Sequence, residues 1–209
     1  MFILRKTLVA ITGLFICIFL IAHLGANFIL LLPPSIAHDA YNNYSAFLRG
    51  NPLVTVIAYV NYVCILAHIV LAIYLTAKSK TTRQKQYAKF SGTEVSSWSS
   101  QNMALLGSVV FAFIVLHMAQ FWFKVKILGQ EHDLYLMVVE LFNNPIYVII
   151  YTLAMLPIAM HLHHGVKSAF MSMGLYHKKY LRWVAKAAVV YSYIIGFGFA
   201  VIPVVVFIR

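Results

Sequence analysis

The sequence predicts an all-α protein, an integral membrane bundle of five transmembrane helices. Of its 209 residues, 62% are hydrophobic and 10% are charged, and the mean hydropathy is +0.84. Soluble domains carry about 25% charged residues. A domain of this length could not bury so much apolar surface within its own core. The apolar side chains are therefore expected to face lipid.

Five segments lack Asp, Glu, Lys and Arg and are long enough to cross a bilayer. Backbone polar groups in hydrocarbon must be paired within their own segment, so each segment is predicted to be a helix. The five predicted helices cover residues 8–32, 53–77, 103–123, 146–166 and 187–208. Together they are expected to form a single domain over residues 1–209.

Signals that start and stop helices flank these segments. Pro33-Pro34 is expected to end the first helix. Asn51-Pro52 and Asn144-Pro145 pair an N-cap residue with a proline at the first helical position of the second and fourth helices. The first segment is too long for the apolar region of a signal peptide and contains His23, so it is predicted to remain as a helix.

The basic residues predict an orientation. Twelve of the 16 Lys and Arg lie before the first segment, between the second and third, or between the fourth and fifth. The positive-inside rule then places the N-terminus in the cytoplasm and the C-terminus outside, with the chain in the inner (cytoplasmic) membrane of a cell. Because these loops account for the net charge of +11, no nucleic-acid partner is expected.

Histidines are the informative polar residues, since an ionisable group within a membrane indicates a function by default. At about 1.5 Å per residue, His23 and His117 lie roughly 25 and 22 Å from the cytoplasmic ends of their helices. His68 and His161 lie roughly 15 and 9 Å from the cytoplasmic ends of theirs. The four side chains are therefore predicted to form an outer pair and an inner pair.

Two pairs of histidines at two depths, each drawn from two helices, predict two haem b groups with these four residues as iron ligands. Zinc or copper is a rival prediction, but a tetrahedral site needs three or four ligands at one depth. A proton relay also uses membrane histidines, although it does not require two separated pairs. No Cys-x-x-Cys-His motif is present, so the haems would be bound non-covalently.

The fourth helix offers three histidines, of which one must be chosen. His163 points about 160° away from His161, whereas His164 and Gly165 return to nearly the same face. A haem lying against a helix needs a small residue beside its ligand, and Gly165 provides one four residues after His161. His161 is therefore preferred to His164 as the ligand, with Gly165 as part of the haem-binding surface.

The order of histidines, one or more in each of the first four helices and none in the fifth, resembles a known family. It is the di-haem cytochrome b membrane anchor of succinate:quinone oxidoreductases and fumarate reductases, and the similarity is greatest to its type B members. The stretches that carry the resemblance cover most of the chain: FLIAHLGAN at 19–27, AHI at 67–69, SSWSSQNM at 96–103, VLHMAQFW at 115–122, DLYLMVVELFNNPIYV at 133–148 and HLHHGVKSAFMSMG at 161–174.

The resemblance implies that His23 and His117 hold the distal haem, and His68 and His161 the proximal one. It also implies two partners on the cytoplasmic side, a flavoprotein subunit that interconverts succinate and fumarate and an iron–sulfur subunit. Electrons would reach a membrane quinone, commonly menaquinone, and the isolated chain would have no turnover. Some fumarate reductases of the family carry a glutamate where this chain has Ala159, so their transmembrane proton route is not expected here.

The quinone is expected to react near the outer haem, where polar residues lie close to the end of the first helix and the start of the fourth. The candidates for the quinone site are Asn27, His38, Asp39, Tyr41 and Glu140. Each of them could equally be a solvated surface residue. Two other functions stay open: an anchor cytochrome b of a different respiratory oxidoreductase, and a non-redox membrane transporter with structural histidines.

Overall fold

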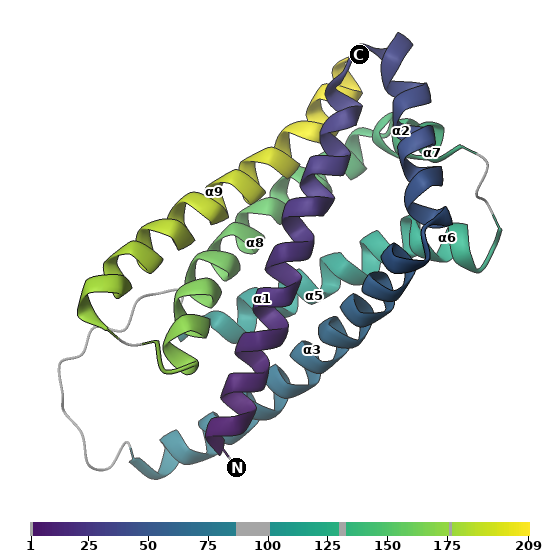
Figure 1. Ribbon diagram of the computed structural model, residues 1–209. Coiled ribbons are helices and arrows are strands. Elements are labelled where there is room, and N and C mark those ends of the chain that lie inside the picture. The colour runs from purple at the N-terminus through teal and green to yellow at the C-terminus, as the bar shows by residue number, and fades with distance from the viewer. Residues whose placement is uncertain (1, 87–100, 130–132, 176) are drawn as a thin grey trace.

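The computed structural model describes residues 2–86, 101–129, 133–175 and 177–209 (Figure 1). Within these ranges the regular structure is helical and contains no strand, which confirms the all-α prediction. In chain order the elements are α1 (Phe2–Asn27), the 3-10 turn η1 (Phe28–Leu31), α2 (Pro34–Gly50), α3 (Pro52–Gln86), α5 (Met103–Gln120), α6 (Trp122–Lys126), α7 (Leu134–Phe142), α8 (Pro145–Ser172) and α9 (Lys178–Ile208). Residues 96–100 of the family-like stretches lie outside the described residues.

In the described part of the chain, five helical stretches are long and apolar enough to cross a membrane: α1 with η1, α3, α5 with α6, α8 and α9. Four of them contain their predicted segment in full and the first contains all but residue 32 of its own, so the chain is a multi-pass membrane protein. Helix α3 continues to Gln86 and α9 begins at Lys178. These two helices are longer than the predicted segments because charged residues end an apolar run without breaking the backbone hydrogen bonds of a helix.

Prolines and asparagines mark the helix starts as predicted. Asn51 accepts a hydrogen bond from the backbone N–H of Leu53 through Oδ1 at 2.9 Å, and Asn144 does the same for Ile146 at 2.9 Å. These caps satisfy backbone donors that have no partner within the helix. The first helix ends earlier than residue 32, because the chain passes from α1 into η1 before Pro33.

Four helices form a ring around a common axis. Helix α1 packs along α3 on one side and α8 on the other, and α5 packs against α8 and touches α3. Helices α1 and α5 are therefore diagonal to each other, and so are α3 and α8. Helix α9 lies outside the ring, along α8 and in contact with α1 (Figure 1).

Two glycines bring α9 close to its neighbours. A Cβ at Gly196 would lie 2.8 Å from Cβ of Ala159, and a Cβ at Gly198 would lie 2.8 Å from Cδ2 of Leu24. Ala159 thus packs directly against α9. A glutamate at this position, as in some fumarate reductases, could not be accommodated unless α9 moved away from α8.

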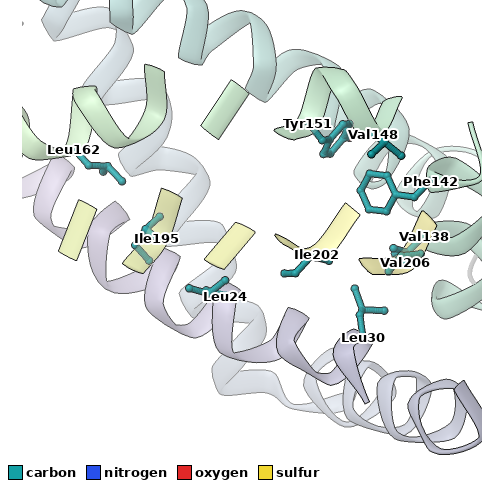
Figure 2. Close-up of a cluster of buried hydrophobic side chains, with 10 residues drawn as sticks. All are labelled: Leu24, Leu30, Val138, Phe142, Val148, Tyr151, Leu162, Ile195, Ile202 and Val206. Atoms are coloured by element: carbon teal, nitrogen blue, oxygen red, sulfur yellow. The ribbon is translucent and has the colours of Figure 1, made fainter. Parts of the chain in front are cut away.

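The buried apolar side chains gather where α1, η1, α7, α8 and α9 meet. Figure 2 shows ten of them, with Tyr151 and Val148 of α8 beside Phe142 of α7. Other large apolar side chains on the long helices face outward, and Leu66 of α3 and Phe197 of α9 are 64% and 74% exposed. Such exposure is unfavourable in water and favourable in lipid.

Helices α2 and α7 pack together at the end of the bundle opposite the N-terminus (Figure 1). Asp133 caps α7 by accepting a hydrogen bond from the backbone N–H of Leu136 at 2.8 Å. The same carboxylate lies 2.7 Å from Nε2 of His38 and accepts from Nδ2 of Asn42 at 2.9 Å. Oδ1 of Asn42 accepts from the backbone N–H of Tyr135 at 3.1 Å. We call these contacts the α2–α7 clamp.

Helix α2 is not among the predicted segments, because its apolar residues are interspersed with polar ones. Its buried residue is Ala37, whereas Ile36 and Phe47 are exposed. A search for uninterrupted apolar segments detects membrane spans and misses an amphipathic helix of this kind.

Arg209 closes the same end of the bundle. Its guanidinium donates to the carbonyl oxygens of Leu30, Leu31 and Leu32 at 3.2, 2.6 and 2.6 Å. These carbonyls belong to the C-terminal end of the first span and have no partner further along a helix, so a cation there is favourable.

Candidate functional site

His23 of α1 and His117 of α5 face each other across the four-helix ring. Their ring centres are 5.9 Å apart, and the ring planes meet at 76°. Aromatic side chains from α1, from α5 and the residue that follows it, and from α8 and α9 surround the pair: Phe19, Phe113, Phe121, Tyr151 and Phe199. We call His23 and His117 the first histidine pair.

His68 of α3 and His161 of α8 form a second pair across the other diagonal of the ring. Their ring centres are 6.4 Å apart, and their planes meet at 74°. Of the three histidines on α8, His161 is the one whose ring faces His68, whereas His163 is exposed. The structure thus brings together the same two pairs of histidines that were predicted from their depths.

The two pairs lie at different levels along the bundle. His68 packs against Gly13 of α1, which is ten residues, or about 15 Å of helix, from His23 on the same helix. His161 packs against Gly107 of α5, which is likewise ten residues from His117. Because both helices give the same offset, the second pair lies about 15 Å from the first along the ring axis.

Hydrogen bonding determines which nitrogen of His68 is free. Its Nδ1 lies 3.2 Å from the carbonyl oxygen of Val9 and 3.4 Å from Oγ1 of Thr12. A carbonyl oxygen can only accept, so Nδ1 carries the proton and Nε2 keeps its lone pair. This is the arrangement that prepares a histidine to bind a metal through Nε2.

The other three histidines of the two pairs differ in the hydrogen-bond partners of Nδ1. Nδ1 of His23 lies 3.4 Å from the amide of Asn27, which also donates to the His23 carbonyl at 2.8 Å. Nδ1 of His117 and Nδ1 of His161 are buried and have no hydrogen-bond partner in the described part of the chain. One histidine of each pair is therefore held through Nδ1 by residues of α1, and its partner is not.

The distance between the two rings in each pair matches that expected for a metal held by two imidazoles. Two imidazole nitrogens on opposite sides of one metal, each about 2.0 Å from it, place the ring centres about 6 Å apart. The separations here are 5.9 and 6.4 Å. No group of three or more His, Cys, Asp and Glu that could hold a metal occurs among the described residues. Each site offers two nitrogen ligands, and a haem iron takes its other four from the porphyrin.

The structure does not place Gly165 against a histidine ring. A Cβ at Gly165 would meet Cε of Met103 at 3.7 Å, an ordinary contact, so its role beside a haem stays a prediction. The glycines that touch the second pair are Gly13 and Gly107, which sequence reasoning missed. In the sequence, each of these glycines comes ten residues before a histidine of the first pair, Gly13 before His23 and Gly107 before His117. This common spacing could have identified them.

The predicted quinone residues fall into separate places. The hydroxyl of Tyr41 donates to Oδ1 of Asn27 at 3.5 Å, which links α2 to the first histidine pair, and burial raises the pKa of Tyr41 to about 12. His38 lies between Asp39 and Asp133 in the α2–α7 clamp. Asp133 was not predicted, although it follows the third segment closely enough to reach this end of the bundle.

Glu140 lines a cavity at the same end of the bundle, together with Asp133 of the α2–α7 clamp. The cavity has a volume of about 740 Å³. Its polar lining includes Gln120, Lys124, Asp133, Glu140, Asn144 and Tyr147, together with apolar residues of α7. Gln120 follows His117 by one helical turn and donates to the hydroxyl of Tyr147 at 3.1 Å. The cavity therefore begins one turn of α5 away from the first histidine pair.

Comparisons with protein-family models, curated proteins and solved structures found no match to this chain. Its function is therefore argued from its residues and their geometry.

Proposed function

We propose that this protein is the di-haem cytochrome b membrane anchor of a succinate:quinone oxidoreductase or fumarate reductase. In this role it connects an iron–sulfur subunit to a membrane quinone, with menaquinone favoured. The observation that carries the proposal is the pair of histidine pairs, with ring centres 5.9 and 6.4 Å apart, on the two diagonals of one ring of apolar helices.

His23 and His117 would hold the distal haem, and His68 and His161 the proximal one. When bound, each haem would supply one-electron transfer. The chain's own residues keep the ligands in place and exclude water. The Val9 carbonyl holds His68 in the tautomer that ligates through Nε2. The aromatic side chains around the first pair keep its surroundings apolar.

The proposal includes an orientation and partners. With the N-terminus in the cytoplasm, the second pair lies toward the cytoplasm, and the α2–α7 clamp lies outside. The iron–sulfur and flavoprotein subunits would bind the basic cytoplasmic face, and the quinone would bind at the clamp end, near the first pair. The geometric support for this arrangement is the 15 Å offset between the pairs and the polar cavity at the clamp end.

Purification of the full chain in mild detergent tests the proposal. The pyridine haemochrome assay is expected to give two haem b per chain, and mass spectrometry is expected to find an iron–sulfur protein and a flavoprotein in the preparation. Succinate-dependent quinone reduction is expected only when these subunits are present. A chain without reducible b-type absorbance would overturn the haem assignment. Two haems with partners of another kind would favour a different respiratory oxidoreductase.

A further inference from the structure

The ring of His68 lies directly on the backbone of α1 at Gly13. We propose that Gly13 is a positioning residue for His68, and that Gly107 has the same role, with a looser fit, for His161. The significance of these contacts for the proximal haem rests on the function proposed above. The contact between Gly13 and His68 can be tested whether or not that function holds.

A side chain at Gly13 would press on the His68 ring, which would have to give way by a few tenths of an ångström. A Cβ there would lie 3.0 Å from Cε1 and 3.3 Å from Nδ1 of His68. The atoms that would have to give way are those of an imidazole ring, which is flat and rigid. The ring as a whole would therefore shift away from α1.

The same close approach brings His68 to its hydrogen-bond acceptor. Val9 lies one helical turn before Gly13, so the Val9 carbonyl points along the helix towards Gly13. A ring lying over Gly13 can therefore place Nδ1 at 3.2 Å from this oxygen. Displacement of the ring would lengthen that hydrogen bond and release the constraint that keeps the proton on Nδ1.

Gly107 is a weaker case of the same contact. A Cβ at Gly107 would lie 3.5 Å from Cε1 and 3.9 Å from Nδ1 of His161, which are ordinary van der Waals distances. Among the described residues, Nδ1 of His161 has no hydrogen-bond partner that a shift would disturb. The two glycines thus predict a graded response to the same added methyl group, larger at position 13 than at position 107.

The first experiment compares the variants Gly13→Ala and Gly107→Ala with wild type. Gly25→Ala is the matched control, because Gly25 is on the same helix as Gly13 and a Cβ there would meet nothing within 4 Å. The readouts are haem b per chain and the midpoint potential of each haem. Gly13→Ala is expected to lose the proximal haem or shift its potential and leave the distal haem unchanged. Gly107→Ala is expected to shift the potential of the proximal haem slightly, and Gly25→Ala is expected to leave it unchanged.

A double-mutant cycle separates a contact with the His68 ring from close packing of the two helices. Thermal unfolding in detergent is measured for wild type, Gly13→Ala, His68→Ala and the double variant. If Gly13 makes room for the ring, Gly13→Ala lowers the unfolding temperature in the wild-type background and has little effect once the ring is removed. If the variant fails to accumulate, recovery of expression in the double variant serves as the same readout.

The outcomes distinguish this inference from the proposed function. Wild-type protein without haem would overturn the proposed function, while the stability cycle would still decide whether Gly13 accommodates His68. Two haems in wild type with an unchanged proximal haem in Gly13→Ala would overturn the positioning role. An equal loss of stability in both backgrounds would overturn the contact with the ring.

Discussion

Nε2 of His38 lies 2.7 Å from Oδ2 of Asp133, and this contact joins α2 to α7. The hydrogen bonds that His38 makes with Asp39 and Asp133 raise its pKa above the ordinary value of 6.5. Desolvation acts to raise the pKa of Asp133, but hydrogen bonds from Leu136, Asn42 and His38 outweigh it, so the pKa falls below 3.8.

These shifts predict a pH range in which the clamp is strongest. The contribution of His38 is complete below pH 6.5 and is lost as the pH rises through its raised folded-state pKa. The contribution of Asp133 is present above pH 3.8 and is lost as the pH falls through its lowered folded-state pKa. Backbone amides of α7 are therefore expected to exchange with deuterium faster at about pH 9 than at about pH 6, after correction for intrinsic rates. His38→Gln should abolish that difference, and an unchanged difference in this variant would contradict the assignment.

The histidine pairs predict selective loss of one haem. Replacing His68 or His161 with alanine is expected to remove the haem held by that pair and leave the other, because the two pairs lie about 15 Å apart. Low-temperature absorbance spectra and haem b per chain measure the effect. His163→Ala is the control, since this exposed neighbour should be replaceable without loss of either haem. Loss of both haems, or of neither, from His68→Ala would count against the pairing.

Asn27 is expected to support the first pair. Its Nδ2 lies 3.4 Å from Nδ1 of His23 and donates to the His23 carbonyl oxygen at 2.8 Å, so the amide packs against the ring and restricts its position. Asn27→Leu should lower the affinity for the distal haem about 10-fold and leave the proximal haem unchanged. A roughly 10-fold loss is the lower end of the range for removing a residue that supports a metal ligand. Titration of haem into haem-depleted protein measures this affinity. Asn43→Leu, at an exposed position of α2, provides the control.

Arg209 predicts a loss of stability that is independent of haem. Arg209→Met removes the hydrogen bonds to the carbonyls of Leu30, Leu31 and Leu32. The free energy of unfolding should fall by roughly 1–2 kcal/mol. This is less than three buried charge-assisted hydrogen bonds would contribute together, because the side chain is exposed. Denaturant unfolding in detergent measures the change, and Arg49→Met, at another exposed arginine, should have little effect.

A photoaffinity quinone is expected to label the clamp end of the bundle. Labelled peptides should contain Asp39 or residues that line the cavity beside Glu140. Two electrons delivered across part of the membrane couple turnover to the membrane potential, by at most about 2.3 kcal/mol per charge for each 100 mV. Labelling near Trp98 and Ser99, which lie outside the described residues, would overturn the placement of the quinone.

Much of the fold could be predicted because membrane spans are governed by one-dimensional properties. An uninterrupted apolar run of sufficient length must form a helix in lipid, so the five long helices followed from composition alone. The depth of each histidine followed from the constant rise of a helix. That arithmetic was enough to predict which histidines share a level, although it contained no information about their neighbours.

The tertiary structure decided what depends on the rotation and packing of the helices. The diagonal placement of α1 against α5, the contact of His68 with Gly13 and its hydrogen bond to Val9 all follow from which helix faces meet. The same is true of Ala159 against Gly196, and of the α2–α7 clamp built by Asp133. These contacts join residues distant in sequence, and they result from many small packing energies summed over whole helix faces. A pattern along a single helix reports the depth of a side chain in the membrane, whereas its partner is selected only when the helices pack.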